Sequence, residues 1–185
     1  MSGRREKFVV EGVEVEGYLA EASSGSGPVV VVIQEWWGLV PHICSVADRL
    51  AAEGFHAFAP DLYRGETTTR PDDAGRRMME LNIAQAGREI QAAARAMRAL
   101  DAAQPKKVAV LGFCMGGQLA LHAACSYPKD FEAVVDFYGI HPKAEIDLAA
   151  LEAPVLAHFA DHDEFVPKEK AEARVRDLET LGKDT

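Results

Sequence analysis

Residues 112–116 read Gly-Phe-Cys-Met-Gly, which places a cysteine at the centre of a glycine-x-nucleophile-x-glycine pattern. An apolar run at 108–111 precedes the pattern, and a helix-like segment opens at 118–121. Glycines at these positions let a strand turn sharply into a helix, which leaves the central residue strained and exposed above the sheet. Cys114 is therefore predicted to be a nucleophile that faces a crevice, with the helix N-terminus favouring its thiolate. The backbone N–H of Met115 is then placed to stabilise an oxyanion.

The alternative for Cys114 is a small cysteine buried in a glycine-rich packing turn. The other cysteines, Cys44 and Cys125, fall within helix-like segments where small thiols commonly pack, so both are interpreted as structural. The chain holds 3 cysteines, without Cys-x-x-Cys or Cys/His ligand spacing, so neither a disulfide framework nor a zinc site is expected.

Glu35 lies at the end of the apolar run 29–33 and is followed by Trp36 and Trp37. A carboxylate beside aromatic residues can share a proton with a neighbouring thiol or act as an acid–base group. The backbone N–H of Trp36 is the natural second oxyanion donor, because this loop lies beside the predicted turn at Cys114. The alternative is a strand-end glutamate that points into solvent.

Asp163 follows another buried run, 155–159, and precedes Pro167, which is placed to start a helix. In a nucleophile–acid–histidine order, the acid lies on such a loop and orients the histidine. The alternative is a helix N-cap, since Asp161 and Glu164 also precede the helix. Position alone leaves these two interpretations balanced.

The segments between these motifs alternate between strand and helix. Residues 8–20 alternate apolar and acidic positions around Gly12, which predicts an antiparallel hairpin. The expected core strands are 29–33, 57–59, 108–111, 133–137 and 155–159, and the expected helices are 43–53, 73–102, 115–127 and 168–181. Asn82 and Gly87 are candidate breaks in the longest helix. This order predicts a single α/β domain, with a mostly parallel sheet, helices on both faces and an N-terminal antiparallel hairpin.

Composition limits the classes of partner. The chain has 185 residues, Lys+Arg 20 against Asp+Glu 29, a net charge of -9 and a pI near 5.1. An acidic chain without a basic patch is not expected to bind nucleic acid or an anionic membrane. The expected partner is instead a small molecule or another protein. No apolar run is long enough to span a bilayer and no secretory signal is visible, so a cytoplasmic location is expected.

Five segments together resemble the dienelactone hydrolase family of α/β-hydrolases, from the N-terminal hairpin to the last residue. They are QEWWG at 34–38, APDLYRG at 59–65, GFCMGG at 112–117, FYG at 137–139 and DEFVP at 163–167. By this resemblance, Cys114 is the nucleophile, Asp163 the triad acid and Glu35 the residue that contacts the resting thiol, while Trp36 and Met115 supply the oxyanion N–H groups. The implied reaction is hydrolysis of a lactone or carboxylic ester through a cysteine acyl-enzyme, without a metal or organic cofactor.

The chain departs from the family in two respects. The triad histidine of the family lies beyond a further strand after the helix that follows Asp163, and none of the 6 histidines, His42, His56, His122, His141, His158 and His162, occupies that position. We therefore expect a domain that lacks the final strand, the histidine and the last helix, with an exposed sheet edge that favours a homo-oligomer. Arg76 and Arg77 lie in the region where the family binds a substrate carboxylate, but the tyrosine one turn later is missing. The two arginines are therefore either carboxylate ligands or solvated charges on a helix surface.

Two other functions fit part of the pattern. Class I glutamine amidotransferase-like proteins also pair a cysteine at such a turn with a strand-end glutamate, and act in redox sensing or on reactive carbonyls. A non-catalytic binding protein with the α/β-hydrolase fold fits the missing histidine. The segments at 59–65 and 163–167 favour the hydrolase.

Overall fold

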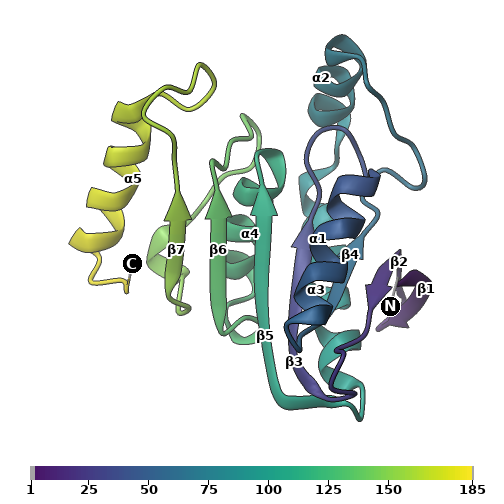
Figure 1. The fold of residues 1–185 in the computed structure, drawn as a ribbon. Helices are drawn as coiled ribbons and strands as arrows, with labels where there is room; N and C mark the ends of the chain where they lie inside the picture. The colour runs from purple at the N-terminus through teal and green to yellow at the C-terminus, as the bar shows by residue number, and fades with distance from the viewer. Residues whose placement is uncertain (1–2, 185) are drawn as a thin grey trace.

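The computed structural model describes residues 3–184, and these residues form one seven-stranded sheet in the order β1-β2-β4-β3-β5-β6-β7 (Figure 1). β1 pairs antiparallel with β2 and β2 antiparallel with β4, whereas the remaining neighbours are parallel. The strands are β1 (Arg4–Val10), β2 (Val13–Ala20), β3 (Gly27–Ile33), β4 (His56–Pro60), β5 (Ala103–Phe113), β6 (Ala133–Phe137) and β7 (Val155–His158). The predicted hairpin and the mostly parallel sheet are both confirmed.

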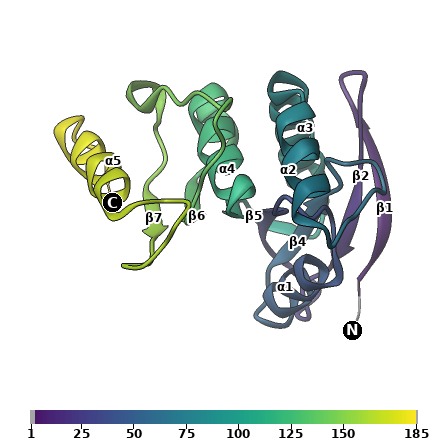
Figure 2. The same cartoon turned by 90° about the horizontal axis from the view of Figure 1, so that it is seen from above.

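The helices lie on both faces of this sheet, as the alternation of elements predicts. They are α1 (Pro41–Ala52), α2 (Pro71–Glu80), α3 (Ile83–Ala99), α4 (Met115–Ser126) and α5 (Lys168–Thr180), with short 3-10 turns at Pro128–Asp130 and Leu148–Ala150. Figure 2 shows α1 on one face of the sheet and α3 and α4 on the other. Within residues 3–184, no helix is both long and apolar enough to cross a bilayer.

The long helical segment predicted for 73–102 is divided once. Asn82 separates α2 from α3 because its side-chain oxygen accepts a hydrogen bond from the backbone N–H of Gln85 at 3.0 Å, which caps the N-terminus of α3. The expected break at Gly87 is wrong, since this residue lies inside α3. It is buried, and it faces His122 and Tyr127 without side-chain bulk of its own.

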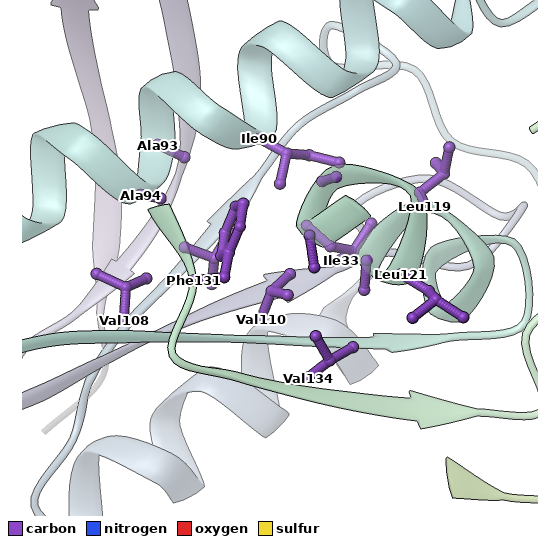
Figure 3. Close-up of a cluster of buried hydrophobic side chains, with 14 of the residues drawn as sticks. Ile33, Ile90, Ala93, Ala94, Val108, Val110, Leu119, Leu121, Phe131 and Val134 are labelled. Carbon is purple, nitrogen blue, oxygen red and sulfur yellow. The ribbon is translucent and has the colours of Figure 1, made fainter. Parts of the chain in front are cut away.

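The core lies between the central strands and the pair α3 and α4. β3 reads Gly-Pro-Val-Val-Val-Val-Ile and its last five residues are all buried, as expected of a parallel strand covered on both faces. Figure 3 shows Ile90 of α3, Leu119 of α4 and Val110 and Val134 of the sheet in one cluster of buried side chains. Burial of these aliphatic side chains holds α4 against β5.

The carboxyl ends of the parallel strands lie at one edge of the sheet, at the top of Figure 1. β3, β5, β6 and β7 are neighbours there, so the loops that follow them converge. Ligands bind at this edge in open α/β sheets. On the outer side of β7, the backbone N–H of Val155 donates to the carbonyl of Asp184 at 2.9 Å, so the chain returns alongside this strand after α5.

The first turn of α4 packs directly on the end of β3, which makes Gly116 a test of this fold. A Cβ atom there would lie 2.4 Å from the carbonyl oxygen of Ile33. Gly116→Ala is therefore expected to lower the free energy of unfolding by about 1–3 kcal/mol, measured by urea denaturation.

The matched control is Gly87→Ala within α3, where the added methyl would meet its nearest atom at 3.6 Å. This variant is expected to be stabilised by about 0.5–1 kcal/mol, because alanine restricts the unfolded chain more than glycine does. Equal effects of the two substitutions would contradict the close approach of α4 to β3.

Candidate active site

Cys114 lies at the turn between β5 and α4 in a left-handed backbone conformation, with φ 53° and ψ -121°. A Cβ atom on Gly112 would lie 2.0 Å from the carbonyl oxygen of Gly116, so only glycine permits the tight turn there. The Cys114 N–H donates to the carbonyl of Phe137 at 2.9 Å, and the Cys114 carbonyl accepts from Ile140 at 3.1 Å. The predicted strand–turn–helix geometry is confirmed, and the β6 loop holds the turn in place.

Cys114 opens on a cavity of about 710 Å³ at the carboxyl edge of the sheet. Glu35 and Asp163 line the same cavity, so the structure brings the predicted thiol and both carboxylates together. The other walls come from the β3 loop, α2, the β6 loop and the segment leading into α5. The lining includes Trp36, Trp37, Met78, Gln118, Tyr138, Ile140, His141, Phe159, Phe165, Val166, Lys170 and Arg174.

Burial raises the pKa of the Cys114 thiol above its ordinary value, and the charges of Glu35 and Asp163 raise it further. The Met115 backbone N–H lowers this pKa by donating a hydrogen bond to Cys114, as the helix N-terminus predicts, but this effect is the smaller one. The expectation that the turn favours the thiolate is therefore wrong for this chain, because desolvation outweighs the helix N-terminus. Cys114 is held as a thiol at neutral pH.

Glu35 is partly buried just beyond β3, and its Oε1 accepts a hydrogen bond from the Tyr138 hydroxyl at 3.4 Å. It does not point freely into solvent. Trp36 follows and packs edge-to-face against Trp37, with ring centroids 5.0 Å apart, and against Phe165 at 6.1 Å. These aromatic contacts link the β3 loop to the loop that carries Asp163.

Asp163 is not the N-cap of α5, which is Pro167, but it closes the turn that leads into this helix. Its Oδ1 accepts hydrogen bonds from the backbone N–H groups of Phe165 at 2.7 Å and Val166 at 2.9 Å, so it caps the turn before α5. Its carboxylate also lines the cavity, and Oδ2 has no hydrogen-bond donor among residues 3–184. The capping bonds fix the carboxylate while one oxygen stays available.

Among the described residues, the cavity lining includes a single histidine, His141, and its ring is already occupied. Nδ1 accepts from the Lys143 N–H at 3.1 Å, so Nε2 carries the proton and donates to the carbonyl of Met78 at 3.0 Å. Burial lowers the pKa of His141, which keeps the ring neutral. His141 therefore fastens the β6 loop to α2 and does not offer a free nitrogen to a substrate.

The other histidines lie outside the cavity. His56 contacts backbone groups of Ala22 and Ala102, and His122 contacts the Glu145 carbonyl. His42 packs near Phe113, while His158 stacks on Phe137 with ring centroids 4.6 Å apart. His162 is exposed on the loop after β7. Within residues 3–184, the structure thus brings no histidine with an available nitrogen to Cys114.

Arg76 and Arg77, for which the sequence left a substrate-binding and a surface role open, are not among the residues that line this cavity. Arg76 pairs with Glu80 at 3.0 Å on the surface of α2, and Arg77 pairs with Glu66. Sequence reasoning missed Arg174 of α5, which does reach the cavity wall.

Arg174 is held by the fully buried Asp136 at 3.1 Å and by the side-chain oxygen of Gln118 at 2.8 Å. This network joins α5 to β6 and α4. A Cβ atom on Gly117 would lie 2.2 Å from the Asp136 carboxylate, which explains the second glycine after the cysteine motif.

The protonation state of the Cys114 thiol can be measured without a substrate. Because the pKa of Cys114 is raised, its alkylation by iodoacetamide is expected to be slow at pH 7. The rate should rise by about tenfold per pH unit until the pH exceeds the ordinary cysteine pKa of about 8.5. Peptide mass spectrometry follows residue 114 separately from the buried Cys125, whose pKa burial raises to about 12. A rate at Cys114 that is already constant between pH 6 and pH 8 would contradict this assignment.

Comparison with known proteins agrees with this geometry. Residues 15–184 match the model of the dienelactone hydrolase family. A putative carboxymethylenebutenolidase of Aquifex aeolicus is 38% identical over 170 residues, which cover 89% of this chain and 73% of the relative. A carboxymethylenebutenolidase homolog of Mus musculus is 28% identical over 169 residues, covering 89% of this chain and 67% of the relative.

Solved structures agree as well. A dienelactone hydrolase-like promiscuous phosphotriesterase, P91, from metagenomic libraries has a TM-score of 0.83 at 28% identity and covers 98% of this chain and 78% of its own. A putative dienelactone hydrolase from Klebsiella pneumoniae has a TM-score of 0.80 at 23% identity, over 99% of this chain and 83% of its own, which supports the fold. With a family model that spans nearly all the described residues, the chain belongs to the dienelactone hydrolase family of hydrolases and not among the amidotransferase-like proteins.

Proposed function

We propose that this chain is a thiol hydrolase that cleaves a small lactone or carboxylic ester through an acyl-enzyme on Cys114. One observation carries the proposal: a cysteine in a strained left-handed turn opens on a cavity that two carboxylates also line. A left-handed backbone at a bulky residue costs free energy and persists where the surrounding structure imposes it, commonly at active sites. The names of the relatives support a lactone or ester as the substrate.

The first half of the proposed reaction forms a thioester. The Cys114 proton moves to the Glu35 carboxylate, and the thiolate attacks the acyl carbon to form a carbon–sulfur bond. The backbone N–H groups of Met115 and Trp36 stabilise the resulting oxyanion. The carbon–oxygen bond of the ester then breaks, and the proton on Glu35 passes to the departing alkoxide. Burial of Cys114, to which the charges of Glu35 and Asp163 add, raises the pKa of the thiol and makes this proton acceptor necessary.

The second half hydrolyses the thioester. Water attacks the acyl carbon, a base takes its proton, and the carbon–sulfur bond breaks to release the acid and restore the thiol. The family uses a histidine oriented by an aspartate for this step. Asp163 has the geometry for that orienting role, since its Oδ1 is fixed by two backbone N–H groups and its Oδ2 is available. The residues 3–184 themselves supply no such histidine at the cavity.

The shape and chemistry of the cavity favour a compact apolar substrate. Trp36, Phe165 and Phe159 line it together with Ile140, so most of the wall near Cys114 is aromatic or aliphatic. Such walls bind the apolar body of a small ester, while a few polar groups orient its carbonyl. The basic residues of the lining are Lys170, Arg174 and His141. Both ring nitrogens of His141 are hydrogen-bonded, and Arg174 is paired with Asp136.

Turnover of an activated aryl ester tests the nucleophile. We expect a burst of released phenol equal to one acyl group per chain, and loss of the burst by at least about a hundredfold in Cys114→Ala. The control is Cys44→Ala, which removes a partly buried thiol on α1 and should retain the burst. A full burst in Cys114→Ala would contradict the proposal, and ligand binding without any burst in the unaltered chain would favour a non-catalytic binding protein.

Added imidazole tests whether hydrolysis of the thioester lacks a general base. Because no histidine of the described residues offers a nitrogen to the cavity, deacylation is expected to limit turnover of residues 1–185. Neutral imidazole in solution can act as the base, so the steady-state rate should increase with its concentration after the burst. The increase should be absent from Cys114→Ala. If imidazole leaves the steady-state rate unchanged while the burst persists, the assignment of the limiting step is wrong.

A further inference from the structure

Tyr138 has an unusual backbone. It follows β6 directly and has φ 43°, a left-handed conformation that costs a bulky residue about 1–2 kcal/mol. Glycine adopts this conformation without that cost, yet a tyrosine occupies the position and Gly139 comes next. An aromatic residue at such a strained position suggests a role for its side chain.

The backbone around Tyr138 is fixed to Cys114. The residue before it, Phe137, accepts a hydrogen bond from the Cys114 N–H at 2.9 Å, and Ile140 donates to the Cys114 carbonyl at 3.1 Å. Tyr138 itself donates its N–H to the carbonyl of His158 in β7 at 2.8 Å. The left-handed turns at Tyr138 and Cys114 are therefore joined by backbone hydrogen bonds on both sides of Tyr138.

The phenol of Tyr138 connects this pair of turns to Glu35. Its hydroxyl donates to Oε1 at 3.4 Å, and among residues 3–184 it is the only side-chain donor to the Glu35 carboxylate. Burial raises the pKa of Tyr138 to about 12, and the charges of Glu35, Cys114 and Asp163 add to this effect. The hydroxyl thus stays protonated at neutral pH and remains a hydrogen-bond donor there.

We propose that Tyr138 is a positioning residue that holds the Glu35 carboxylate beside the Cys114 thiol through its hydroxyl hydrogen bond. The inference rests on the proposed function, in which Glu35 receives the thiol proton. Tyr138 acts here through Glu35, and no contact with the substrate is required. Its strained backbone brings the phenol from the β6 loop to the Glu35 carboxylate on the β3 loop. Hydrogen bonds therefore connect the segments that follow β3, β5 and β6.

This role predicts opposite effects on two measurements. If the hydroxyl is removed, Glu35 loses its only side-chain anchor and moves away from Cys114. Ester cleavage then slows because the proton acceptor is misplaced. Alkylation of Cys114 becomes easier, because the carboxylate that raises the thiol pKa is no longer close. General loss of structure would also ease alkylation, because exposure removes the desolvation that raises the thiol pKa, so the dependence of the shift on Glu35 is what distinguishes the two causes.

The test is Tyr138→Phe, which keeps the ring that lies near Phe113 and removes only the hydroxyl. We expect the burst rate with an aryl ester to fall about tenfold, as for loss of one hydrogen bond to a charged group. The pH profile of Cys114 alkylation by iodoacetamide should move to lower pH, as it should in Glu35→Gln. In a Glu35→Gln background, Tyr138→Phe should produce no further change in either measurement.

Tyr18→Phe is the matched control, because Tyr18 also donates its hydroxyl to a carboxylate, that of Asp48, away from the cavity. It should leave both measurements unchanged. An unshifted alkylation profile in Tyr138→Phe, or an equal effect of this substitution with and without Glu35, would overturn the inference. Alkylation needs no ester, so retention of the burst in Cys114→Ala would reject the proposed function separately from the role of Tyr138.

Discussion

The hydrogen bonds between the Cys114 turn and the β6 loop are the constraint on which the site depends. The backbone of Cys114 is strained, by about 1–3 kcal/mol for a residue of this kind, and it is held by a donor contact to Phe137 and an acceptor contact from Ile140. Gly112 and Gly116 allow the approach, because a side chain on either would collide with backbone. Packing of α4 on the sheet compensates for the strain, and this places the sulfur at the carboxyl edge of β5.

The same position that exposes Cys114 to a ligand also opposes its ionisation. Desolvation and the charges of Glu35 and Asp163 raise the pKa of the thiol, while the Met115 N–H counteracts only part of this increase. A nucleophile in such surroundings depends on an acceptor for its proton and is otherwise unreactive toward general electrophiles. The Arg174 charge does not relieve the effect, because the guanidinium is paired with the buried Asp136. In the proposed reaction, the position of the Glu35 carboxylate therefore decides whether the thiol can lose its proton.

Local sequence patterns predicted the fold closely, since the alternation of strands and helices and the glycines around Cys114 are short-range signals. Asn82 separated two helices as a capping residue should, whereas Gly87 did not, because a helix interior tolerates a single glycine. The pKa direction of Cys114 was not predictable from the helix N-terminus, as it depends on burial by segments distant in sequence. The contact of Tyr138 with Glu35 spans 103 residues. Its sequence signal was the tyrosine between a strand end and a glycine.

Direct detection of the acyl group on the protein tests the central claim that Cys114 is the nucleophile. An aryl ester labelled with carbon-13 at its carbonyl can be added to the chain and the protein-bound carbonyl observed by NMR. The account predicts one thioester carbonyl signal, which is absent from Cys114→Ala and present in Cys44→Ala. An oxygen ester or amide signal that persists in Cys114→Ala, or the absence of any bound carbonyl signal while the ester is being hydrolysed, would contradict it.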